Sequence, residues 1–71
     1  MQSSATLAAN LRAYRMKLGW SQEQLADQSG LHRTYISGLE RNVRNPTLSV
    51  LDVLADTLEV DVVDLLKKRS A

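Results

Sequence analysis

Residues 21–47 read SQEQLADQSGLHRTYISGLERNVRNPT, and they contain the signals from which the fold can be inferred. Ser21 with Gln24 three residues later forms a capping box, in which each side chain serves an unpaired backbone N–H at a helix start. Gly30 is the residue type that adopts the left-handed conformation in which many helices end. A further helix starts close to Arg33. The pattern therefore predicts two short helices joined by a tight turn.

Working outward, the apolar residues on both sides also recur at helical spacing, and no segment alternates as a strand does. One stripe consists of Leu7, Leu11, Tyr14 and Leu18. We expect an all-α fold, a compact five-helix arrangement in one domain over residues 1–71. The helices are expected at about residues 5–18, 22–29, 33–41, 48–58 and 62–69.

The composition excludes several other classes of protein. The chain has no cysteine and one histidine, so neither a disulfide nor a Cys/His zinc site can stabilise it. Its N-terminus lacks the features of a signal peptide, and no apolar run approaches the roughly 20 residues of a membrane span. We expect a cytoplasmic protein that needs no metal, no cofactor, no small-molecule ligand and no membrane.

The central pair of helices has the geometry of a helix-turn-helix motif, in which the second helix presents polar side chains to a partner. The outward positions of that helix are short or hydrogen-bonding residues, namely Arg33, Thr34, Ser37 and Gly38. Six basic and three acidic residues lie among residues 1–45, whereas three basic and five acidic residues follow. Both features favour contact between the first part of the chain and the phosphates of DNA.

The stretch LGWSQEQLADQSGLHRTYISGLERNVRNPTLSVLDVLADTLEV, residues 18–60, resembles the phage-repressor and Cro-like (XRE-type) family of transcriptional regulators. Within that family, RTYISGLERNVRNP is most similar to the controller proteins of restriction–modification systems. The resemblance implies a λ-repressor-like domain that regulates transcription as a repressor or activator. It also implies that the third helix enters the major groove of DNA.

The resemblance also implies roles for individual residues. The base-reading residues would be Arg33, Thr34, Tyr35, Ser37 and Gly38, with Arg33 pairing with guanine. The phosphate-binding residues would be Gln22, Asn42, Arg44 and Asn45. Arg15 and Glu40 would form a partly buried ion pair between the first and third helices.

Some residues admit a second interpretation. Tyr35 could pack in the core with its hydroxyl at the rim instead of contacting DNA. His32, close to a helix start, fits a cap or a phosphate neighbour better than a metal ligand or a catalytic base. No glycine-rich phosphate loop, pair of inward carboxylates or nucleophile elbow occurs, so the sequence does not predict an enzyme. A protein-interaction module, such as an antitoxin or co-regulator with the same fold, is the alternative function.

The C-terminal part of the chain predicts a dimer. One recognition helix reads too few base pairs to select a site in a genome, so two subunits are expected on a pseudo-palindromic operator of the protein's own gene or an adjacent one. The last helix carries more apolar residues than it can bury within its own subunit, and we expect the homodimer contact at Val62, Val63 or Leu66. RNA polymerase is a candidate for a further partner.

Overall fold

The computed structural model describes the backbone of residues 2–68 and the side chains of residues 5–68. This part of the chain forms five helices, α1 (Gln2–Lys17), α2 (Gln22–Ser29), α3 (Arg33–Glu40), α4 (Leu48–Leu58) and α5 (Val62–Leu66), and contains no strand. The prediction of an all-α, five-helix fold is confirmed.

The helix bounds differ from the expected ones mainly at the two ends of the chain. α2 and α4 have the expected bounds, and α3 ends one residue early, at Glu40. α1 begins at Gln2 instead of residue 5, and it ends at Lys17. α5 ends at Leu66 because Lys67 is in an extended conformation, so a helix to residue 69 is wrong, and Arg69 itself lies outside the described residues.

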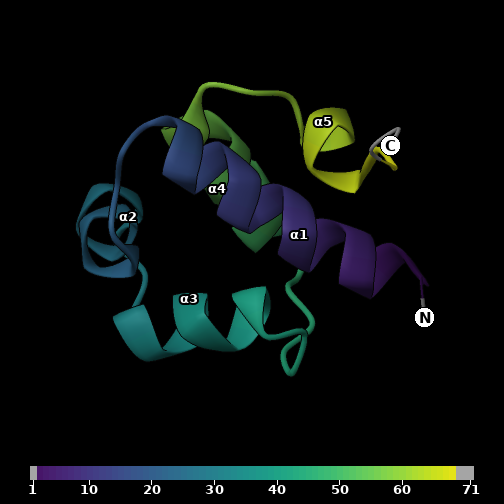
Figure 1. Ribbon diagram of the computed structural model, residues 1–71, viewed down its shortest axis with the longest axis horizontal. Coiled ribbons are helices and arrows are strands. Elements are labelled where there is room, and N and C mark those ends of the chain that lie inside the picture. The colour runs from purple at the N-terminus through teal and green to yellow at the C-terminus, as the bar shows by residue number, and fades with distance from the viewer. Residues whose placement is uncertain (1, 69–71) are drawn as a thin grey trace.

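α1 is the helix that connects the two sides of the molecule. It packs against α3 and against α5, while α2 packs on α3 and α4, and α4 packs on α5. In Figure 1 α1 crosses the centre of the view, with α3 along the lower edge and α5 above it. α3 and α5 therefore lie on opposite sides of α1, and each can present its own surface.

The core lies between these helices and consists almost entirely of aliphatic side chains. Its largest fully buried apolar members are Leu11, Leu25, Ile36, Leu39, Leu54 and Leu65. Tyr14 and Trp20 pack partly against this cluster. Leu18 was expected in the same stripe as Leu11, but it is 47% exposed because it follows the end of α1 and lies in the turn.

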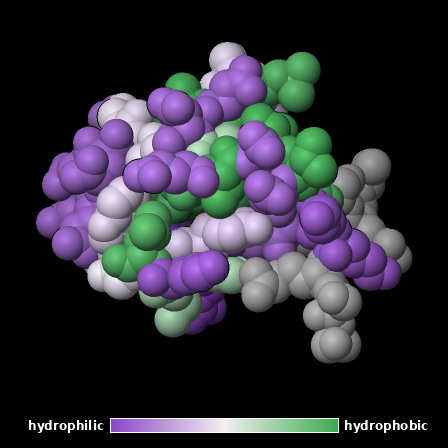
Figure 2. Space-filling model, turned by 90° about the horizontal axis from the view of Figure 1, so that it is seen from above, coloured by the Kyte–Doolittle hydropathy of each residue, from purple (hydrophilic) through white to green (hydrophobic). Residues whose placement is uncertain are grey.

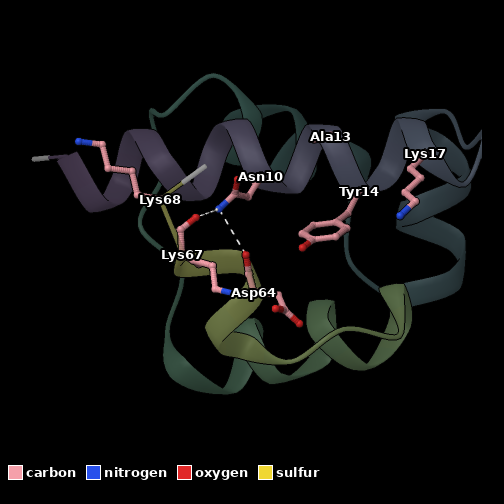
Figure 3. Close-up of a pocket in the computed structure, with 7 residues that line it drawn as sticks. All are labelled: Asn10, Ala13, Tyr14, Lys17, Asp64, Lys67 and Lys68. Carbon is pink, nitrogen blue, oxygen red and sulfur yellow. Dashed lines mark hydrogen bonds between the residues drawn. The ribbon is translucent and has the colours of Figure 1, made fainter. Parts of the chain in front are cut away.

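Asn10 is the polar exception in this core, at 1% exposure. Its Nδ2 donates to the carbonyl oxygens of Lys67 at 2.7 Å and Asp64 at 3.4 Å (Figure 3), and to that of Leu65 at 2.9 Å. These oxygens belong to the end of α5, where carbonyls have no partner within the helix. A helix of five residues is too short to be stable alone, so the hydrogen bonds from Asn10 help to hold α5 on α1.

We expect Asn10→Ala to lower the free energy of unfolding by about 1–3 kcal/mol, because the buried bond to the Leu65 carbonyl and the part-buried ones to Lys67 and Asp64 would be lost. Urea unfolding followed by circular dichroism measures this change. Gln28→Ala is the control, since it removes an exposed amide from α2 and should change the stability by less than about 0.5 kcal/mol. Equal midpoints for the two variants would contradict the role given to Asn10.

Candidate nucleic-acid interface

α2 and α3 form the helix-turn-helix, and the turn between them follows from local chemistry. The Ser21 hydroxyl accepts from the N–H of Gln24 at 3.0 Å, and the Gln24 side chain accepts from the N–H of Ser21 at 2.7 Å. Gly30 ends α2 with φ +77°, a conformation that residues with a Cβ rarely adopt. The predicted capping box and glycine stop are thus both present.

The first turn of α3 presents its polar side chains to solvent. Arg33 and Thr34 are exposed, while Tyr35 and Ser37 are half-buried. Tyr35 packs partly against the core, which agrees with the second interpretation given to it above. His32 precedes the helix at the N-cap position, and its side chain makes no capping hydrogen bond. α3 therefore offers an exposed guanidinium and hydroxyl at its N-terminal end, which a base edge could meet.

The segment after α3 folds back on the helix in a Schellman motif. The N–H of Asn42 donates to the Leu39 carbonyl at 3.2 Å, and the N–H of Val43 donates to the Gly38 carbonyl at 2.9 Å. Asn42 has φ +61°, the left-handed conformation that this motif needs. Asn42 thus has a structural role at the helix end, which the sequence analysis did not foresee.

Gly38 is buried, so the expectation that it faces outward together with Ser37 is wrong. The folded-back segment covers it, because a Cβ added at Gly38 would lie 2.7 Å from Cγ of Arg44 and 3.6 Å from Cγ2 of Val43. The close approach of a side chain of the same protein therefore explains the glycine at this position.

Arg15 and Glu40 form a bidentate ion pair between α1 and the end of α3. Nε of Arg15 donates to Oε2 of Glu40 at 2.6 Å, and Nη2 donates to Oε1 at 2.9 Å. Nη1 of Arg15 donates to the carbonyl oxygen of Trp20 at 2.7 Å. The two side chains are 11% and 4% exposed, so most of the pair is shielded from water.

Gln22 forms a hydrogen bond to this ion pair, a contact that its predicted role in phosphate binding did not include. Its Nε2 donates to Oε1 of Glu40 at 3.1 Å. The Glu40 carboxylate therefore receives hydrogen bonds from α1 and from the first residue of α2. The position of Gln22 at a helix N-terminus still allows its backbone N–H to face an anion.

The environment of Arg15 keeps it charged. The side-chain hydrogen bond to Glu40 raises the pKa of Arg15 above its ordinary value, and burial opposes this increase. A guanidinium is already protonated at every pH at which proteins are studied, so the pair always contains its positive partner.

The surface of α5 includes two of the three residues predicted for a dimer contact. Val63 is 67% exposed and Leu66 is 41% exposed, whereas Val62 is half-buried and packs against its own core. In Figure 2, hydrophobic surface gathers in the half of the molecule that carries α5, and hydrophilic surface dominates the opposite half. Val63 and Leu66 are therefore the exposed apolar residues of this helix.

A hollow of about 460 Å³ lies between α1 and α5, with Asn10, Tyr14, Lys17, Asp64 and Lys67 among its lining residues (Figure 3).

Asn10 was missed by the sequence analysis, although it lies in the same helical stripe as Leu7 and Tyr14. An amide in an otherwise apolar stripe was the signal that could have revealed it.

Among residues 5–68, no group of three or more His, Cys, Asp or Glu side chains is arranged to hold a metal ion. None of the helices described is long and apolar enough to cross a membrane.

Comparison with known proteins gives consistent matches to one group. The helix-turn-helix family HTH_3 matches residues 11–65. Control protein C.SmaI of Serratia marcescens is 51% identical over 69 residues, which cover 97% of this chain and 82% of that protein.

Two solved structures have a similar fold over nearly the whole chain. The crystal structure of a hypothetical transcription factor from Neisseria superposes with a TM-score of 0.90 at 45% identity, covering 93% of this chain and 76% of that one. The restriction–modification controller protein C.Esp1396I, a tetramer in complex with its natural 35 base-pair operator, superposes with a TM-score of 0.84 at 38% identity, covering 92% and 86%.

We expect Arg15→Ala to lower the free energy of unfolding by about 3 kcal/mol or more, because it leaves the Glu40 carboxylate buried without its cation. Arg12→Ala is the control, since it removes an exposed arginine from the same helix. The double variant Arg15→Met with Glu40→Leu should recover much of the loss, because an apolar pair needs no compensating charge. Thermal unfolding compares the variants, and similar midpoints for Arg15→Ala and Arg12→Ala would refute the structural role of the pair.

Proposed function

The chain belongs to the helix-turn-helix family HTH_3, and we propose that it is a sequence-specific, DNA-binding transcriptional regulator of the controller type. It acts by binding, without catalysis, in the cytoplasm. Its site is a pseudo-palindromic operator in front of its own gene or an adjacent one, which it binds as a homodimer. RNA polymerase is the further partner through which such a protein would activate transcription.

The observation that carries this proposal is the exposed polar end of α3. Arg33 and Thr34 are exposed in the first turn of α3, and α2 packs on α3 in the helix-turn-helix arrangement. In this geometry the N-terminal residues of the second helix reach base edges in the major groove. Arg33 can donate two hydrogen bonds to O6 and N7 of guanine, and Thr34 can bond to a base or contact a thymine methyl.

The other proposed DNA contacts surround these two residues. Tyr35 and Ser37 are half-buried at the edge of the same helix and would contact bases at their exposed rims. The phosphate contacts are assigned to Gln22 at the start of α2 and to Asn42, Arg44 and Asn45 after α3. Gly38 is buried, so it is removed from the base-reading set.

The homodimer is assigned to α5, on the side of α1 away from α3. Val63 and Leu66 are the exposed apolar side chains there, and their burial between two copies would stabilise the dimer. Two subunits related by a two-fold axis would present their α3 helices to half-sites about 34 Å apart. The operator complex of the similar controller protein C.Esp1396I, which is a tetramer, supports assembly of several subunits on one operator.

The test is a titration of the protein against a fluorescent duplex from upstream of its own gene and against a scrambled duplex, by anisotropy at two salt concentrations. We expect tight binding to the upstream duplex alone, and binding that survives moderate salt. Weak binding to both duplexes that disappears with salt would leave only non-specific attraction to phosphate, and would favour the protein-interaction module.

Arg33→Ala and Arg44→Ala separate base reading from phosphate binding in this assay. Arg33→Ala should weaken binding to the upstream duplex by about 1–3 kcal/mol and relax the preference over the scrambled one. Arg44→Ala should weaken both duplexes similarly and make the dependence on salt shallower. Equal losses on the two duplexes for Arg33→Ala would overturn its assignment to base reading.

For the dimer, we expect Val63→Asp to shift the protein toward monomer in sedimentation velocity, because a buried carboxylate without a partner opposes association. Leu48→Asp is a matched control, since Leu48 is 75% exposed and, like Val63, lies in the first turn of its helix. A wild-type protein that is monomeric at micromolar concentration even with operator present would contradict the dimer. Loss of association in the Leu48 variant alone would move the interface away from α5.

A further inference from the structure

Gly38 lies in the interior of α3 where nothing in its backbone conformation requires a glycine. Its φ is not positive, in contrast to Gly19 and Gly30. Glycine is among the least favourable residues in a helix interior and alanine is the most favourable. The reason for a glycine at this position must therefore be space.

Arg44 occupies the space that a side chain at Gly38 would need. An added Cβ would lie 2.7 Å from Cγ of Arg44 and 3.6 Å from its Nε, and it would be only in ordinary contact with Val43. The Schellman hydrogen bond from the N–H of Val43 to the Gly38 carbonyl brings this segment back onto the helix. Figure 1 shows the connection between α3 and α4 folded beside the end of α3.

The covered position belongs to the face of α3 that is proposed to read DNA. Gly38 follows Thr34 by four residues, so the two positions lie one turn apart on the same side of the helix. Thr34 is exposed, whereas Gly38 is buried beneath Arg44, which is itself exposed to solvent. The aliphatic part of Arg44 thus lies against the helix backbone at Gly38, one turn beyond Thr34.

We propose that Gly38 is a positioning residue for DNA binding, which holds Arg44 in place on the C-terminal half of α3. The inference rests on the proposed function, in which Arg44 binds a phosphate. An arginine that is already held in its bound geometry loses less conformational entropy on binding than one that moves freely. A Cβ at position 38 would push Cγ of Arg44 away and remove that advantage.

The experiment compares four proteins: wild type, Gly38→Ala, Arg44→Ala and the double variant. Binding to the upstream duplex is measured by anisotropy over a range of salt concentrations, and thermal unfolding is measured in parallel. Gly38→Ala should weaken binding roughly five- to tenfold and reduce the slope of log K against log salt by about one, as Arg44→Ala does. The double variant should bind no more weakly than Arg44→Ala alone, because the space at Gly38 has no function in binding when Arg44 is absent.

The melting temperatures test the contact between Gly38 and Arg44 independently of DNA binding. In the Arg44→Ala background no Cγ is present, so Gly38→Ala should raise the midpoint by about 4–8 °C through its better helix propensity. In the background with Arg44 the same substitution should raise it by less, or lower it. Additive losses of affinity, or wild-type affinity and salt slope in Gly38→Ala, would overturn the proposal.

A measurement on the unmodified protein covers the case in which Gly38→Ala does not fold. NMR relaxation of the arginine Nε–Hε groups should show Arg44 more ordered than exposed Arg12 in the free protein, because the stem of Arg44 packs on Gly38. Equal mobility of the two side chains would overturn the proposal. If the wild type fails to prefer the upstream duplex, the proposed function fails instead, whereas the melting and relaxation data still test the contact between Gly38 and Arg44.

Discussion

The carboxylate of Glu40 is the point at which three helices are tied together. It accepts two hydrogen bonds from Arg15 of α1 and one from Gln22 of α2, and it belongs to the last residue of α3. The same Arg15 also donates to the carbonyl of Trp20 between α1 and α2. Burial of aliphatic side chains supplies the larger driving force for folding, but it has no preferred direction. The hydrogen bonds to the Glu40 carboxylate do have a preferred direction, so they set the angle at which α2 and α3 meet α1.

A second polar contact serves the opposite side of α1. Asn10 holds the last carbonyls of α5, as Arg15 holds the end of α3. α1 therefore connects the helix proposed to read DNA with the helix proposed to form the dimer. Because the distance between two half-sites on DNA is fixed, the relative placement of α3 and α5 would matter for binding by the proposed dimer. These two buried polar groups on one helix maintain that placement.

The segment after α3 combines two tasks that are usually separate. Asn42 ends the helix in a left-handed conformation, and the residues that follow return to cover Gly38. Without this return, Arg44 would belong to a loose connection and would have to be ordered by each binding event. Because the segment folds back, Arg44, the proposed phosphate contact, is held against α3. In the proposed function, the end of the helix would thus contribute to recognition as well as its beginning.

Local patterns in the sequence were enough to specify the five helices, the turn at Gly30 and the bounds of α2 and α4, because caps and apolar periodicity act between residues three or four apart. The family resemblance paired Arg15 with Glu40, residues that no local pattern connects. No local pattern predicted that Gly38 is buried under Arg44, that Gln22 bonds to Glu40 or that Asn10 reaches the end of α5. Asn10 and Lys67 are separated by 57 residues and Gln22 and Glu40 by 18. The packing of helices brings such pairs together, and it depends on the whole core at once.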